Sequence, residues 1–340
     1  MIDISDKSVL EKYLAERDLI DKDTKIIYLS GGVSGITALV SSKGRDMIIK
    51  QALEKLKVAE EWLCDPSRME IEAKSNEVYH RLVPTNAPEV YFYDEVNYIF
   101  GREAASENCR MWKTDLMTGK LDFNVGRQVI ETLLTVHNEC AKDATVAKDF
   151  DDNGIFYDLR ISPYLEFILI KHPQLTEYSK PVIAELMDAR ITLTHGDFSP
   201  KNVVVDGEKV FVTDFEVAHY GHPSFDLGFM SNHLVLKAIH MENFSGAYLA
   251  MLEYVLNIYF SGANYMDKTA LEKSFLKLLP LLMIARVDGK SPVEYIVRDD
   301  VKQFVRDCAY GIIEKGIDNR KELIAFMADC LAKRKEGIKE

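Results

Sequence analysis

The centre of the chain reads His195-Gly-Asp-Phe-Ser-Pro-Lys-Asn202 and, shortly afterwards, Asp214-Phe-Glu216. Short runs rich in β-branched residues lie before and between these two stretches, at 191–194, 202–205 and 210–213. Asp206-Gly207 separates the last two runs, and this dipeptide is a strong signal for a tight turn between antiparallel strands. We therefore predict a hairpin that returns Asp214 close to Asn202.

The polar residues of these stretches suit phosphoryl transfer to a hydroxyl. That reaction requires a carboxylate beside the attacking oxygen and oxygen ligands for Mg²⁺. Asp197 can orient an acceptor hydroxyl and take its proton, while the amide of Asn202 and the carboxylate of Asp214 suit the metal. In an extended segment Glu216 would share a face with Asp214, and it could then assist the metal or hold the substrate. Each residue alone could equally cap a turn, but the ordered set favours the catalytic interpretation.

Residues 1–102 carry strand and turn signals around two helical segments. We predict helices at 5–20 and 67–82, with Ser67 as the N-cap of the second and Pro84 just beyond its end. Strands are predicted at 25–29, 36–40, 46–50, 89–93 and 98–101. This pattern indicates a small α+β lobe that ends near Arg102.

The remainder of the chain is mainly helical in its periodicity. Helices are predicted at 125–141, 162–171, 224–240, 247–260 and 266–284. We therefore divide the chain into an N-terminal lobe (1–102), a hinge and connection (103–122) and a larger C-terminal lobe (123–340).

The central motif, H-G-D-x-x-x-x-N followed by a hairpin and D-F-E, resembles the aminoglycoside phosphotransferase and choline kinase family. The resemblance implies a bilobal protein-kinase-like fold of the α+β class, with a small β-rich N-lobe and a larger, mainly helical C-lobe. It implies that Asp197 is the catalytic base, that Asn202 and Asp214 bind Mg²⁺, and that His195 is a structural member of the loop. The later run Gly221–Gly228 is similar to a family stretch whose aspartate buttresses the catalytic loop by hydrogen bonding, which assigns that role to Asp226.

The resemblance also implies an ATP site in the N-terminal lobe. A flap over the phosphates would come from Ser30–Gly35, with Gly31, Gly32, Ser34 and Gly35 allowing close approach of backbone N–H groups. Lys50 is the expected phosphate-binding lysine. Among the nearby helix carboxylates we choose Glu72 as its partner, because Glu72-Ala73 resembles the family's E-A pair. Backbone groups around Arg102 and Ala104 should hold the adenine, and Trp112 could pack on the base or in the core.

Within the family, the chain is most similar to the methylthioribose kinase branch, through Lys50–Leu53, Arg68–Glu72 and Phe215–Gly228. That branch tends to have Ser where this chain has Asn202. Its substrate is held by late arginines, which suggests Arg286, although an ion pair at a helix end is an alternative for this residue. We expect Glu216 and His219 near the acceptor as well. The implied reaction moves the γ-phosphate of Mg-ATP to a hydroxyl of a sugar-like, thioriboside-like or amino alcohol compound.

The amino-acid composition limits the classes of partner that the chain is expected to bind. The formal net charge is −12, from 42 basic and 54 acidic residues. This balance disfavours nucleic acid and anionic membranes, which need a dense positive surface, and it would suit a neutral or cationic acceptor. The five cysteines are scattered and never spaced C-x-x-C, which argues against a disulfide framework or structural zinc. With no apolar run typical of a signal peptide near Met1, we expect a cytoplasmic protein. Its late helices could pair in a homodimer or could equally complete one core.

Two other interpretations stay open at this point. The chain could be a catalytically weak, kinase-like ATP-binding module. It could also be a metal-dependent hydrolase, which would require His195, Asp197, His219 and His222 to converge on a transition metal.

Overall fold

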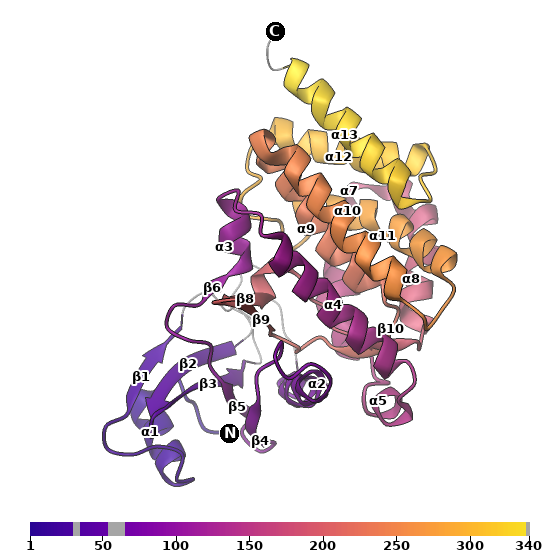
Figure 1. Cartoon of the computed structure of the whole chain (residues 1–340). Helices are drawn as coiled ribbons and strands as arrows, with labels where there is room; N and C mark the ends of the chain where they lie inside the picture. The colour runs from indigo at the N-terminus through magenta and orange to yellow at the C-terminus, as the bar shows by residue number, and fades with distance from the viewer. Residues whose placement is uncertain (30–34, 54–64, 338–340) are drawn as a thin grey trace.

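A computed structural model describes residues 1–29, 35–53 and 65–337 of the chain (Figure 1). It has two parts: a sheet with two helices, drawn in indigo and violet, and a larger helical body that extends to the yellow C-terminal end. The two-part α+β architecture predicted from the sequence is confirmed. Within the described residues, no helix is both long and apolar enough to cross a membrane.

The first part is an antiparallel sheet with the strand order β1-β2-β3-β5-β4. Its strands are β1 (Lys25–Tyr28), β2 (Gly35–Ser42), β3 (Arg45–Ala52), β4 (Val90–Asp94) and β5 (Ile99–Glu103). One apolar face of the sheet, with Val40 and Ile49, packs with Leu10 and Leu14 of helix α1 (Lys7–Ala15). Ala52 and Phe100 pack with Met69 and Ala73 of helix α2 (Arg68–Leu82). Ser67 occupies the predicted N-cap position of α2, but its backbone angles are already helical and its hydroxyl makes no capping hydrogen bond.

The helical body is built around α9 (Ser224–His240), which is buried from residue 224 to residue 239. Two long helices pack against it, α10 (Ser245–Gly262) and α11 (Lys268–Asp288), so every side of α9 meets protein. The other helices are α3 (Trp112–Met117), α4 (Phe123–Cys140), α5 (Ala144–Asp149), α6 (Gly154–Phe156), α7 (Ile168–Lys171), α8 (Thr176–Asp188), α12 (Asp299–Glu314) and α13 (Arg320–Gly337).

The predicted helix at 162–171 is corrected by the structure. A π-helix, η1 (Tyr157–Glu166), precedes the short α7. Pro163 lies inside η1 and has no N–H to donate, and its ring would clash with the carbonyl one α-turn earlier. The backbone widens instead, and the N–H of Phe167 donates to the carbonyl of Ser162, five residues earlier.

Short strands connect the two parts at the middle of the molecule. The predicted hairpin is present as β8 (Val203–Asp206) and β9 (Lys209–Val212), paired from Val203 opposite Val212 to Asp206 opposite Lys209. Strand β6 (Arg110–Met111) extends this hairpin on its other edge. Strand β7 (Thr192–Thr194), which the sequence predicted, pairs with β10 (His219–Gly221). Strand β10 itself was not predicted. Strands β7 and β9 belong to separate short sheets, and the chain that leaves β9 returns to β7 through β10.

Candidate active site

Asp226 anchors the loop that follows β7. Its two carboxylate oxygens accept hydrogen bonds from the backbone N–H groups of His195 (2.7 Å) and Gly196 (2.9 Å). Asp226 is fully buried at the first turn of α9, where the helix dipole favours a negative charge. Gly196 has a φ of +75°, and a Cβ there would lie 2.5 Å from the carbonyl oxygen of Val217. Only glycine fits this bend, and Asp226 holds it closed.

His195 is a structural part of this loop. Its Nδ1 accepts from the N–H of Asp197 at 3.2 Å, and its Nε2 lies 3.2 Å from the carbonyl oxygen of Thr213. A single neutral tautomer, protonated on Nε2, satisfies both contacts. Burial lowers the pKa of His195 despite nearby carboxylates, so the ring stays neutral. It therefore connects the two predicted stretches and shapes the loop.

Asp197 lies between two cations. Nη2 of Arg160 is 3.0 Å and Nζ of Lys201 is 2.8 Å from its Oδ2 atom. Burial would raise the pKa of Asp197, but these two charges outweigh that effect and lower it. Arg160 also donates from Nε to the carbonyl oxygen of Gly196 at 2.7 Å. Arg160 was missed from the sequence, because it comes from the π-helix and no local motif marks it.

Asn202 ends the loop at the start of β8. Its Nδ2 donates to the carbonyl oxygen of Asp197 at 3.0 Å, and its own carbonyl accepts from the N–H of Thr213 at 3.0 Å. Because the amide nitrogen is committed to Asp197, Oδ1 is the side-chain atom that Asn202 offers to a ligand. The hairpin thus places Asn202 beside the residue that precedes Asp214.

Lys50 joins the two parts of the molecule. Its Nζ lies 2.6 Å from Oε1 of Glu72 on α2 and 2.8 Å from Oδ1 of Asp214. Burial opposes the charge on Lys50, but the surrounding carboxylates outweigh it and raise its pKa. The pKa of Asp214 falls although burial would raise it, because Lys50 and Lys201 hold the charge on its carboxylate. Burial raises the pKa of Glu72, and its contact with Lys50 counters part of that effect.

The expectation for Glu216 needs correction. Asp214 has a φ of +71° and a turn follows it, so the segment is not extended and the alternation argument fails. Oε2 of Glu216 instead meets Nε of Arg68 at 3.1 Å. Arg68 is fully buried and also donates to the carbonyl oxygens of Leu53 and Asp65. Glu216 thereby ties α2 to the loop that carries Asp214.

The predicted adenine residues line a small cavity between the two parts. Arg102 and Ala104 contribute to its wall together with Val204, Phe211 and Thr213. Trp112 is fully buried and is not among the lining residues, so its role is core packing. Gly31, Gly32 and Ser34 lie outside the described residues, whereas Gly35 begins β2 opposite Ala52.

A cleft opens beside Asp197, and we call it the Asp197 cleft. Its other charged or titratable wall residues are Lys113, Lys201, His233, Lys237, Arg286 and Glu294. Arg286 forms no helix-end ion pair within the described ranges; its Nη1 donates to the hydroxyls of Tyr164 (3.0 Å) and Ser291 (3.1 Å). Arg286 therefore lines the Asp197 cleft.

His219 does not reach this cleft, which corrects its expected place near the acceptor. It is buried in β10, where its ring stacks on Phe156 with centroids 3.9 Å apart. Burial lowers the pKa of His219 to about 4. His222 faces Glu185 at 3.6 Å. The described residues contain no group of three or more His, Cys, Asp or Glu side chains suited to a metal, so the histidine cluster required by the hydrolase interpretation is not formed there.

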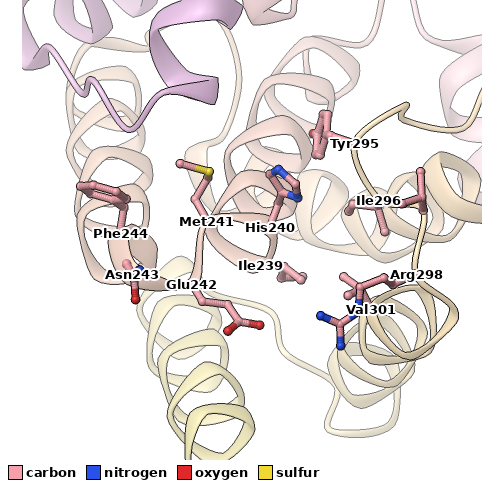
Figure 2. A pocket seen from close by; sticks show the side chains of 11 residues that line it. Ile239, His240, Met241, Glu242, Asn243, Phe244, Tyr295, Ile296, Arg298 and Val301 are labelled. Carbon is pink, nitrogen blue, oxygen red and sulfur yellow. The ribbon is translucent and has the colours of Figure 1, made fainter. Parts of the chain in front are cut away.

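A second cavity also has Tyr295 in its wall (Figure 2). In Figure 2 the rings of Tyr295 and His240 lie side by side, with centroids 5.0 Å apart. The charged residues of this cavity are already in ion pairs, Glu242 with Arg334 at 3.0 Å and Arg298 with Asp300 at 2.7 Å. None of the residues predicted for catalysis lines this cavity.

This arrangement of a small sheet, a connection and a helical body is the protein-kinase-like fold of small-molecule phosphotransferases. The amicoumacin kinase hAmiN has a similar structure, with a TM-score of 0.55, 12% identity and coverage of 91% of this chain and 94% of that one. A choline/ethanolamine kinase family protein from Mesorhizobium loti has a TM-score of 0.53 and 14% identity, with coverage of 94% of this chain and 98% of that one.

The sequence comparisons agree with the fold. Residues 118–260 match the model of the phosphotransferase enzyme family, which confirms the resemblance carried by the central motif. A methylthioribose kinase from Bacillus velezensis is 26% identical over 58% of this chain and 57% of its own length. A methylthioribose kinase from Geobacillus kaustophilus is 28% identical over 57% of this chain and 55% of its own length. The chain thus spans somewhat more than half the length of these curated relatives.

Proposed function

We propose that this chain is a small-molecule kinase that transfers the γ-phosphate of ATP to a hydroxyl group. One observation carries the proposal. Nζ of Lys50, on β3, lies 2.8 Å from Oδ1 of Asp214, and the loop that carries Asp214 neighbours Asp197. Three separate segments thereby bring together the cation of Lys50, the carboxylate of Asp214, which is suited to a metal, and the carboxylate of Asp197, which faces the cleft. In this proposal residues 1–102 hold the nucleotide, 103–122 connect the lobes and 123–340 supply catalysis and acceptor binding.

Asp197 acts on the acceptor. Its pKa is lowered by Arg160 and Lys201, so the carboxylate is ionised at neutral pH and can accept a hydrogen bond from the incoming hydroxyl. The hydroxyl oxygen bonds to the γ-phosphorus while the bond from that phosphorus to the β–γ bridging oxygen breaks. The hydroxyl proton passes to Asp197, and ADP leaves with the bridging oxygen.

The residues present fit Mg²⁺. Asn202 offers Oδ1 because its nitrogen is engaged, and Asp214 offers a carboxylate whose charge is maintained by Lys50 and Lys201. Oxygen donors from one carboxylate and one amide leave room for water and phosphate oxygens, which Mg²⁺ prefers. When bound, Mg²⁺ would neutralise charge on the phosphates. Lys50, positioned by Glu72, would contact the phosphates from the opposite lobe.

Turnover of ATP tests this proposal. We expect ATP consumption with at least one class of hydroxyl compound, and a loss of about 10²–10⁴-fold in kcat for Asp197→Asn, because the variant lacks the base. ATP binding, measured by thermal shift or calorimetry, should persist in the variant. Asp188→Asn, at the exposed end of α8, is the matched control. If ATP binds but no acceptor supports turnover, the result would instead favour the weak ATP-binding module. If ATP neither binds nor is consumed, the kinase proposal is refuted.

A further inference from the structure

The Asp197 cleft is basic although the whole chain is acidic. Its wall contains Lys113, Lys201, Lys237 and Arg286, against the two carboxylates of Asp197 and Glu294. The formal net charge of the chain is −12. The local charge of the cleft is therefore opposite in sign to the overall charge, so the net charge of the chain does not indicate which acceptor the cleft binds.

Both acidic groups of the cleft are already compensated. Asp197 is in contact with Lys201 and also with Arg160. Glu294 pairs with Lys113 at the more exposed rim. Across the ranges that the structure describes, Lys237 and Arg286 have no carboxylate partner. Among the described residues, the ammonium of Lys237 and the guanidinium of Arg286 thus have no ion-pair partner.

Lys237 is the more unusual of the two cations. It projects from the buried helix α9 with only 1% of its surface exposed. Its Nζ lies 5.2 Å from the centre of the Tyr295 ring, and its one hydrogen-bond contact, to the carbonyl oxygen of His233, is long at 3.5 Å. A buried ammonium with such weak partners costs free energy unless an anion completes its surroundings.

Other polar atoms in the same wall also have no hydrogen-bond partner among the residues that the structure describes. They are Nε2 of His233, Nε of Arg286 and the hydroxyl of Tyr295, and all three atoms are buried. His233 and Arg286 are 6% and 9% exposed. Native proteins rarely leave such groups unsatisfied outside sites that bind something. Together with Lys237 they form a set of hydrogen-bond donors that faces one cleft.

The geometry points to an acceptor that carries an oxyanion, a carboxylate or a phosphate, in addition to the hydroxyl that is phosphorylated. This inference rests on the proposed kinase function. The oxyanion would take Lys237 and Arg286 as counter-charges and His233 and Tyr295 as further donors, while the hydroxyl faces Asp197. A cationic acceptor such as an amino alcohol or an aminoglycoside would meet like charges that no carboxylate balances.

The surroundings of Lys237 support this assignment. Burial lowers the pKa of Lys237 to about 7, and the charges of Lys113 and Arg286 act in the same direction, whereas Glu294 opposes them. His233, His240 and Tyr295 are further titratable groups near it. An incoming oxyanion would stabilise the protonated lysine.

Binding of matched compounds tests the inference apart from turnover. The full-length chain is saturated with Mg²⁺ and a non-hydrolysable ATP analogue, so that the nucleotide phosphates are already in place. Calorimetry then compares D-gluconate with D-glucose and D-ribose 5-phosphate with D-ribose. We expect one acidic compound to bind at least about tenfold more tightly than its neutral partner. The gluconate arm identifies a carboxylate and the ribose 5-phosphate arm a phosphate.

Variants of Lys237 locate the effect. Lys237→Met should weaken binding of the preferred acidic compound by about 10- to 100-fold, whereas Lys237→Arg should retain most of it. Lys180→Met, an exposed lysine on α8, is the control. If Lys237→Met does not fold, the wild-type preference and Lys237→Arg still decide the matter. Equal or better binding of the neutral partners, or of ethanolamine, would overturn the inference, while the Asp197→Asn test of the kinase would be unaffected.

Discussion

Replacement of Asp226 by Asn should loosen the catalytic loop without touching a substrate. Each oxygen of Asp226 accepts one buried backbone N–H, from His195 at 2.7 Å and from Gly196 at 2.9 Å. Asn keeps one acceptor oxygen and turns an NH₂ group toward the other N–H, so one buried donor loses its partner. A hydrogen bond to a charged group contributes about 1.5–3 kcal/mol, and a buried unsatisfied donor adds a penalty of similar size. We therefore expect the free energy of unfolding to fall by about 3–6 kcal/mol.

The same substitution should lower kcat. Asp197 follows directly on the two anchored residues, and a displacement of about 1 Å in such a group can cost about 100-fold in rate. KM for ATP should change by less than about threefold, because Lys50 and Glu72 lie in the other lobe. Urea denaturation gives the unfolding free energy, and a coupled ADP assay gives kcat and KM. Asp188→Asn controls for loss of a surface carboxylate. An Asp226→Asn protein as stable as the wild type, with unchanged kcat, would refute the anchoring role.

Two further predictions concern the loop and the cleft. Gly196→Ala should destabilise the protein by about 1–3 kcal/mol and reduce kcat, because the backbone is left-handed and the new methyl meets Val217. Gly207→Ala shares a positive φ but meets open space, so urea denaturation should show a smaller loss, and equal losses would contradict the steric argument. For Lys237, kcat/KM for an acidic acceptor should fall by about tenfold per pH unit above about pH 7, because the free ammonium loses its proton there. A pH–rate series should show no such fall for a neutral acceptor, and an identical fall for both would show that Lys237 is not responsible.

Local signals in the sequence were sufficient for the hairpin and the loop before it. Runs of β-branched residues on either side of Asp206-Gly207 define β8 and β9, since strand pairing across a tight turn depends only on neighbouring residues. The same locality explains why α9 was predicted with its observed ends. The resemblance of Glu72-Ala73 to a family pair pointed to the carboxylate that contacts Lys50 in the structure.

Other parts of the site depended on contacts between distant segments. The positive φ of Asp214 turns Glu216 toward Arg68, and no pattern in the local sequence reveals that angle. Arg160 reaches Asp197 because Pro163 widens a helix into a π-turn.

The sequence by itself indicated the kinase chemistry that we propose, because the motif from His195 to Asp214 is a compact set of chemically specific residues. Only the tertiary structure decided the character of the acceptor cleft. Lys113, Lys237 and Arg286 come from α3, α9 and α11, and each alone resembles an ordinary helix cation. The burial of Lys237 and Arg286, which removes solvent and leaves both without an ion-pair partner among the described residues, exists only once those helices pack together.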